Sequence, residues 1–181
     1  LVEFFPGGAL LAVVDGLGHG PSAELAARTA VDALRAAPRR SVEELVHACH
    51  EGLKRTRGAV MSLASFDVAR STMTWVGVGN VEGVLLRRDG IEVQRERLFV
   101  RGGIVGQALP TLRPGTVAVS RDDVIVFATD GLDSSFIDAR LAQEVLRGEE
   151  VELMARRLLE QHARERDDAL VLVGRYRGAD S

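Results

Sequence analysis

The stretch Leu10-Leu11-Ala12-Val13-Val14-Asp15-Gly16 joins a wholly apolar run to an aspartate and a glycine. A run of this length and composition predicts a strand that is buried on both faces. The arrangement returns at residues 124–128, which are followed by Thr129-Asp130-Gly131. A third apolar run, residues 169–173, comes directly after Asp167-Asp168. Three predicted buried strands therefore each carry carboxylates at one end.

These carboxylates share one edge of the sheet if the third strand runs antiparallel to the other two, because its start then lies beside their ends. Each Asp-Gly pair taken alone is a common turn dipeptide, so the prediction rests on the recurrence. Clustered carboxylates repel one another and need a cation, and ligation by oxygen alone favours Mg²⁺ or Mn²⁺ over zinc. If one aspartate bridges two ions, the site can activate a water and hold a phosphate oxygen.

Composition narrows the class of protein. The chain has 181 residues, of which 46% are hydrophobic and 27% charged, as is typical of a soluble globular domain, and we expect a single domain over residues 1–181. The net charge of −3, without a block of Lys or Arg, gives no support for nucleic-acid binding. No apolar run is long enough to span a membrane, and no signal peptide is visible. The single cysteine, Cys49, fits a reducing compartment, and we expect a cytoplasmic protein.

The remaining pattern alternates helix pairs with hairpins. Pro21 suits the first position of a helix, and Ser41 with Glu44 forms a capping box for the next one. Two further helices are expected around Leu141 and over residues 151–159, separated by Gly148. We expect strands at residues 59–68, 72–78, 81–88, 91–97, 117–120 and 124–129. Hairpins imply antiparallel pairing, so we predict an α+β layered sandwich with antiparallel sheets inside and helix pairs outside.

The glycine-rich turn after Asp15 allows two interpretations. It enters a helix N-terminus, which favours anions, but its spacing fits neither the P-loop nor the dinucleotide fingerprint. Glycine also lets the backbone approach a metal, with the Gly16 carbonyl as a candidate ligand. His19 lies in this turn and could be a general acid for a leaving alkoxide, or could order the turn or hold a metal-bound water.

Three other polar residues have simpler explanations. His47 and His50 are three residues apart and could pair on a metal, but no third ligand is apparent, so a solvated helix surface is the better interpretation. Arg101 begins a glycine-rich loop and could meet a phosphate, although a plain connecting loop is favoured.

With these residues in view, the chain resembles the metal-dependent protein phosphatase family (PPM, type 2C). The Gly-Leu-Gly-His-Gly form is similar to the bacterial branch of sporulation and sigma-factor regulators, and the short chain looks most like that branch's small stressosome phosphatase. The segments that carry the resemblance are Ala12-Val13-Val14-Asp15-Gly16-Leu17-Gly18-His19-Gly20, Ala128-Thr129-Asp130-Gly131 and Arg166-Asp167-Asp168-Ala169.

The resemblance implies an αββα four-layer sandwich with two Mn²⁺ or Mg²⁺ ions at one end. By motif position, Asp15 would bridge both ions, the Gly16 carbonyl would bind the first, and Asp130 and Asp167 the second. Asp168, where many relatives have Asn, would support the site without binding metal. A metal-activated water would attack phosphoserine or phosphothreonine in line. The implied partners are phosphorylated stressosome or anti-sigma-antagonist (STAS-type) proteins.

The chain departs from the family pattern in three places. The family's preceding strand, with its acidic residue and often a phosphate-binding arginine, is not in this sequence. Leu17 stands where eukaryotic members have a histidine, so the family's acid role does not transfer to His19. The short connection at residues 132–135 predicts an open site that reads a folded protein surface.

Two other classes of function stay open on the sequence alone. A non-catalytic binding or scaffold module could keep the fold without turnover, although retention of the three aspartates argues against it. A nucleotide-binding protein that uses the glycine turn is weaker still.

Overall fold

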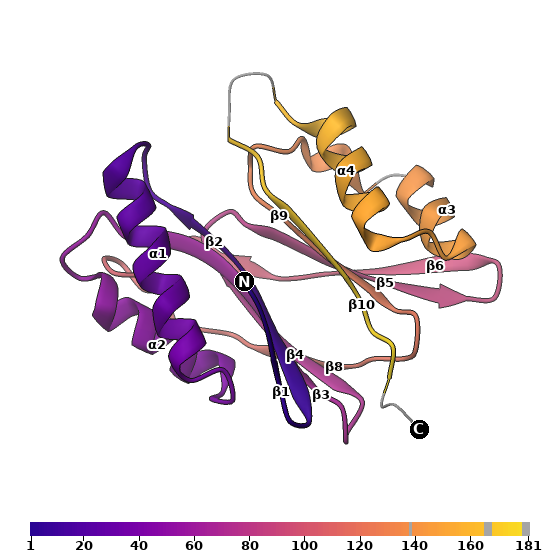
Figure 1. Ribbon diagram of the computed structural model, residues 1–181, viewed down its shortest axis with the longest axis horizontal. Helices are drawn as coiled ribbons and strands as arrows, with labels where there is room; N and C mark the ends of the chain where they lie inside the picture. Colours follow the sequence, from indigo (N-terminus) through magenta and orange to yellow (C-terminus); the bar gives the residue numbers. More distant parts are fainter. Residues whose placement is uncertain (138, 165–167, 179–181) are drawn as a thin grey trace.

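The computed structural model describes residues 1–137, 139–164 and 168–178, and they form two β-sheets between two pairs of helices (Figure 1). The first sheet has the order β1 (Val2–Phe5), β2 (Gly8–Gly16), β3 (Ala59–Asp67), β4 (Thr72–Val78) and β7 (Val100–Arg101), with β8 (Gly115–Ala118) also paired to β4. The second has the order β10 (Val171–Arg175), β9 (Val124–Ala128), β5 (Glu82–Asp89) and β6 (Glu92–Arg97). The predicted α+β sandwich is confirmed.

The helices pack against the outer faces of the two sheets. The pair α1 (Pro21–Ala36) and α2 (Val42–Leu53) covers the first sheet, and α3 (Ala139–Arg147) and α4 (Val151–His162) cover the second (Figure 1). A short 3₁₀ helix, η1 (Ser134–Phe136), precedes α3. The predicted capping box of α2 is present: Ser41 N donates to Glu44 Oε2 at 2.9 Å, and Glu44 N donates to Ser41 Oγ at 3.3 Å.

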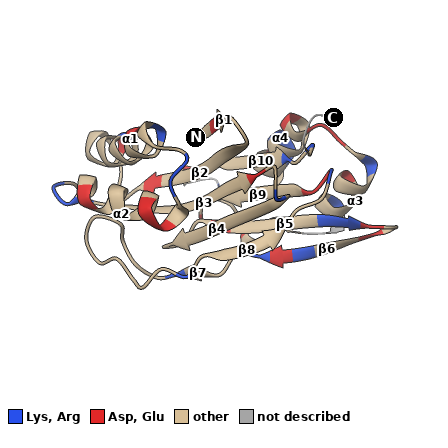
Figure 2. Cartoon of the chain, turned by 90° about the horizontal axis from the view of Figure 1, so that it is seen from below, with Lys and Arg blue, Asp and Glu red and all other residues tan. Residues whose placement is uncertain are grey.

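Three apolar layers fill the spaces between these four layers of structure. Along β2, Leu10 and Ala12 pack under α1 and α2, whereas Leu11 and Val13 pack between the two sheets. Successive side chains of a strand point to opposite faces, so a strand covered on both sides reads as an unbroken apolar run. This explains why the apolar run at residues 10–14 has no polar residue before Asp15. The charged residues follow the same rule (Figure 2). Strands β3 and β4 have almost no charged residues, whereas the β5–β6 hairpin carries both positively and negatively charged ones.

The third apolar run differs from its prediction. β10 is half-buried along its whole length, because β9 is its sole strand neighbour in the part of the chain described. Two pockets, of about 470 and 710 Å³, lie along it and are lined mainly by apolar side chains of β10, β2 and α4. The run was therefore wrongly predicted to be buried on both faces. The short strands β1 and β7 were not predicted at all, and β8 lies in the other sheet from β9.

Two expectations drawn from composition can be compared with the fold. Cys49 is fully buried on α2, and this burial raises the pKa of its thiol to about 12, so it behaves as a small apolar residue. None of the helices in the described ranges is both long and apolar enough to cross a membrane.

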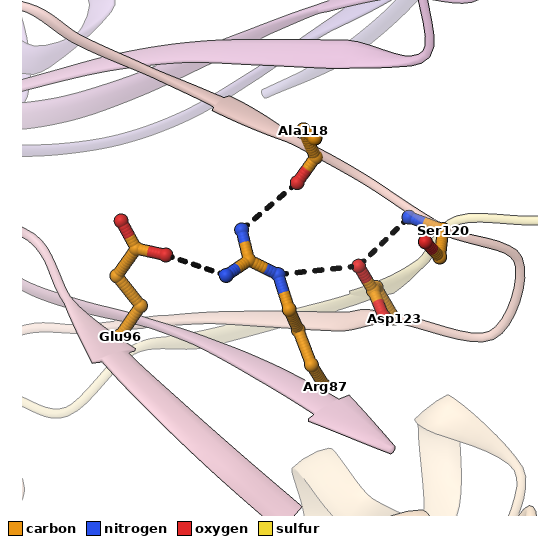
Figure 3. Close-up of polar contacts among 5 residues, drawn as sticks. All are labelled: Arg87, Glu96, Ala118, Ser120 and Asp123. Atoms are coloured by element: carbon orange, nitrogen blue, oxygen red, sulfur yellow. Dashed lines mark hydrogen bonds and ion pairs between the residues drawn. The ribbon is translucent and has the colours of Figure 1, made fainter. Parts of the chain in front are cut away.

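Arg87 of β5 ties the two sheets together where the chain crosses from β8 to β9 (Figure 3). Its Nη1 lies 2.7 Å from Glu96 Oε2 on β6, and its Nη2 donates to the Ala118 carbonyl of β8 at 2.8 Å. Its Nε faces Asp123 Oδ2 at 3.7 Å, and that same oxygen accepts the Ser120 N–H at 2.8 Å. One guanidinium thus contacts both sheets and the turn that joins them.

Burial raises the pKa of the Asp123 carboxyl, while the Ser120 N–H and Arg87 oppose that rise. Because the pKa in the folded protein lies above that of the unfolded chain, the contribution of Asp123 to stability is complete at low pH. It is lost as the pH rises through the raised pKa. Arg87 limits this loss because it faces the ionised carboxylate, whose side chain is only 4% exposed.

We expect Arg87→Met to lower the free energy of unfolding by about 2 kcal/mol at pH 7, because it leaves a buried carboxylate without its cation. The loss should shrink at about pH 4, where more of the Asp123 carboxyl is protonated. Urea unfolding at both pH values measures this. The control is Arg88→Met, since Arg88 on the same strand has one hydrogen bond within the described ranges, to the Gly90 carbonyl at 3.4 Å. Equal losses at the two pH values would contradict the assignment to Asp123.

Candidate active site

The sheet topology brings the ends of three strands to one edge. β2 and β4 both run antiparallel to β3, with Asp15 opposite Val60 and Val78 opposite Met61, so β2 and β4 end at the same edge. In the second sheet β10 runs antiparallel to β9, with Val171 opposite Ala128. The start of β10 therefore lies beside the end of β9, as predicted. In Figure 1, β2 and β9 both run toward the upper left, where their ends lie.

A side-chain hydrogen bond joins the two sheets at this edge. Asn80, two residues after β4, donates from Nδ2 to Oδ2 of Asp130, two residues after β9, at 2.6 Å. This bond places Asp130 beside the edge at which β4 and β2 end, and Asp15 is the penultimate residue of β2. Asn80 was not among the predicted site residues. A related signal could have found it, since Asn80 follows the mainly apolar β4 with one glycine, Gly79, between them.

Neither Asp-Gly pair is a turn dipeptide of the ordinary kind. Gly16 and Gly131 do not have positive φ angles. Glycine is needed there for space instead, because a Cβ on Gly16 would lie 2.0 Å from the carbonyl oxygen of Ala23 in α1. A Cβ on Gly131 would lie 2.2 Å from the carbonyl oxygen of Asp168. Each glycine lets a neighbouring backbone approach the residue that follows an aspartate.

The Gly16 carbonyl points away from β3. Ala59 of β3 lies opposite Gly16, but its backbone hydrogen bonds go to Val105 instead. The Ala59 N–H donates to the Val105 carbonyl at 3.0 Å, and the Val105 N–H donates to the Ala59 carbonyl at 2.9 Å. The opposite side of β2 pairs with β1, but that pairing stops where Leu1 N donates to Ala12 O at 2.8 Å. The carbonyl of Gly16 therefore lies beyond the start of β1, and no hydrogen bond to it is found within the described ranges.

The candidate residues differ in their surroundings. Asp15 is half-buried at the end of β2 and interacts with a neighbour, whereas Asp130 and Asp168 are exposed. His19 is exposed, and across residues 1–137, 139–164 and 168–178 its imidazole makes no hydrogen bond. An exposed imidazole is compatible with either role considered for it, as proton donor or as part of the turn.

Asp167, one of the predicted metal ligands, lies outside the described residues. Among those described, no three side chains of His, Cys, Asp or Glu lie close enough together to hold a metal ion. The predicted donors that the structure describes near the ends of β2 and β9 are the carboxylates of Asp15 and Asp130 and the Gly16 carbonyl. An all-oxygen set of this kind fits Mg²⁺ or Mn²⁺. Assignment of the metal ligands stays a prediction.

Two of the residues that had simpler explanations have structural roles near this edge. His50 accepts the Gly106 N–H on Nδ1 at 2.9 Å, so it anchors the 101–106 loop to α2, which the surface interpretation missed. His47 is exposed, as expected. The guanidinium carbon of Arg101 lies 6.0 Å from the centre of the Phe99 ring, and the Arg101 carbonyl accepts the N–H of Gly79 at 2.8 Å.

The family model for stage II sporulation protein E (SpoIIE) matches residues 6–177, nearly the whole chain. The chain belongs to the SpoIIE family. Among curated proteins it is similar to phosphoserine phosphatase RsbX of Bacillus subtilis (strain 168), with 25% identity over 165 residues that cover 91% of this chain and 79% of RsbX.

Solved structures agree with this assignment. A crystal structure of RsbX in complex with magnesium superposes with a TM-score of 0.79 at 21% identity, covering 95% of this chain and 82% of the other. A chain from work on the bacterial stressosome, described as a modular system adapted to control secondary messenger signalling, gives 0.78 at 27% identity over 96% and 87% of the two chains. The serine/threonine phosphatase PstP of Mycobacterium tuberculosis gives 0.75 at 18% identity over 98% and 91%.

These matches confirm the predicted PPM-type phosphatase family and its αββα sandwich. The family assignment makes the chain a phosphatase, and its similarity to RsbX agrees with the resemblance seen in the sequence.

We expect Gly16→Ala to destabilise the protein by about 2 kcal/mol or more, since its Cβ would overlap a backbone oxygen that cannot rotate away. Gly102→Ala is the matched control, because nothing lies within 4 Å of a Cβ there, and it should stay within about 0.5 kcal/mol. Thermal or urea unfolding measures both. Similar stabilities for the two variants would contradict the close approach of α1 to β2.

Proposed function

We propose that residues 1–181 form a single PPM-type domain that hydrolyses phosphoserine or phosphothreonine on proteins, with two Mn²⁺ or Mg²⁺ ions as cofactors. The observation that carries the proposal is the bond from Asn80 to Asp130. It joins Asp130, two residues after β9, to the edge at which β2 ends with Asp15 and Gly16. The family match and the all-oxygen donors support the same reading.

The proposed ligands are those of the family pattern. Asp15 would bridge the two ions, the Gly16 carbonyl would bind the first, and Asp130 and Asp167 the second. Divalent cations held there would supply an activated water and would offset charge on the phosphoryl oxygens. Asn80 fixes the carboxylate of Asp130 by donating to one of its oxygens, which leaves the other oxygen and the remaining lone pair for a cation.

For partners, we propose phosphorylated proteins of a bacterial stress-signalling complex, of the stressosome or anti-sigma-antagonist class. The support is the similarity to RsbX and to the chain from the stressosome work. A cytoplasmic location follows from such partners. The connection from Asp130 to η1 is short, and we propose that the site reads a folded protein surface as substrate.

Asp15→Asn and Asp130→Asn should each lower Mn²⁺-dependent hydrolysis of a phosphoserine peptide about a thousandfold, because each removes a carboxylate from the metal site. Asp32→Asn is the control, since Asp32 lies on the exposed face of α1 and, among the described residues, pairs with Arg35 alone, at 3.7 Å. Hydrolysis by the parent that both site substitutions leave intact would contradict the proposal.

The melting temperature with and without Mn²⁺ separates the remaining outcomes. An increase in the parent, together with no turnover, would favour the scaffold alternative over an enzyme. If the parent shows no turnover and Mn²⁺ does not raise its melting temperature, the acidic metal site itself is overturned. Stabilisation by ATP in place of Mn²⁺ would favour the nucleotide-binding alternative.

The proposed role of His19 as general acid predicts a dependence on the leaving group. His19→Gln should slow hydrolysis of a phosphoserine peptide about a hundredfold, but should slow an aryl phosphate far less, because a phenolate leaves without protonation. Equal slowing of the two substrates would assign His19 to ordering the turn. Steady-state kcat with both substrates decides between them.

A further inference from the structure

The side chain of Arg57 lies against the glycine turn that follows Asp15. A Cβ built on Gly18 would stand 2.5 Å from Nη1 of Arg57, so the guanidinium occupies the space that a side chain at position 18 would fill. Gly18 also has a φ of +94°, which a residue with a side chain rarely adopts. Glycine at this position therefore shapes the turn and leaves room for the arginine.

The backbone around Arg57 is anchored at the start of β3. Leu17 N donates to the Gly58 carbonyl at 3.0 Å, which ties this segment to the turn after β2. Gln107 Nε2 donates to the Arg57 carbonyl at 2.6 Å, and Gly58 N donates to Thr56 Oγ1 at 3.0 Å. The side chain of Arg57 thus extends from a fixed point on the edge where β2 and β4 end.

The charge of Arg57 is not neutralised by the residues that the structure describes. Its guanidinium makes no hydrogen bond or ion pair within residues 1–137, 139–164 and 168–178, and it is exposed. Two arginines described near this edge have other neighbours. Arg101 lies over the ring of Phe99, and Arg164 lies within electrostatic range of Asp133.

We propose that Arg57 binds the phosphoryl group of the substrate, an inference that rests on the proposed phosphatase function. Asp15 and Asp130 lie at this edge and repel a phosphate dianion, so a cation beside them offsets that repulsion. A guanidinium can donate two parallel hydrogen bonds to phosphate oxygens, which orients the group as well as attracting it. Arg57 is therefore a substrate-binding residue of the site, supplied by the α2–β3 connection.

The test compares Arg57→Gln, Arg57→Lys and, as matched control, Arg101→Gln. Arg57→Gln should raise both the KM for a phosphoserine peptide and the inhibition constant of inorganic phosphate about tenfold or more, since a charge-assisted pair is lost. Arg57→Lys should lie between this variant and the parent, because lysine keeps the charge and loses the fork. Arg101→Gln should stay within about twofold of the parent, since its guanidinium is engaged on a ring.

Unchanged KM and unchanged phosphate inhibition in Arg57→Gln would overturn the proposal, and so would an equal change in Arg101→Gln. If the parent shows no turnover, the proposed function fails, and the role of Arg57 is then decided by the melting temperature in inorganic phosphate with Mg²⁺. Stabilisation of the parent that is lost in Arg57→Gln supports the phosphate contact. Equal stabilisation of both proteins, or none of the parent, contradicts it.

Discussion

Burial of β2 and β9 on both faces is the constraint on which the rest of the structure depends. Each strand is packed between a helix pair and the opposite sheet, so its position is fixed by apolar contacts on two sides. A carboxylate at or near the end of such a strand is held in place by the strand, so little further entropy is lost in positioning it. Asp15 and Asp130 stand in these two places, and the Asn80–Asp130 bond joins the sheets that carry them.

Close backbone approach is what the site requires of the surrounding chain. Glycine at 16 and 131 lets α1 and the backbone of Asp168 come nearer than any side chain would permit. Glycine at 18 does the same for the guanidinium of Arg57. This edge combines two carboxylates with a carbonyl and an arginine that have no hydrogen-bond partner among the described residues. It therefore offers ligands for a cation and hydrogen-bond donors for an anion. A phosphate ester brought to a metal needs both.

Much of this was predictable from sequence, because the informative patterns are local. Apolar runs identified β2 and β9, Ser41 with Glu44 identified the start of α2, and the hairpins fixed the antiparallel pairing. What depends on distant partners was not predictable. The half-burial of β10, the pairing of β8 with β4 and the two-residue strand β7 are set by neighbours far along the chain. Asn80 and Arg57 are single polar residues in loops, and no periodicity distinguishes them from others.

The most direct test of the account is a crystal structure determined with Mn²⁺, in which anomalous scattering locates the ions. The account predicts two peaks about 3.5–4 Å apart at the edge shared by β2 and β9, between the carboxylates of Asp15 and Asp130 and with the Gly16 carbonyl on one of them. Peaks elsewhere on the molecule, or none at this edge, would contradict the claim that the two sheets converge to build one metal site.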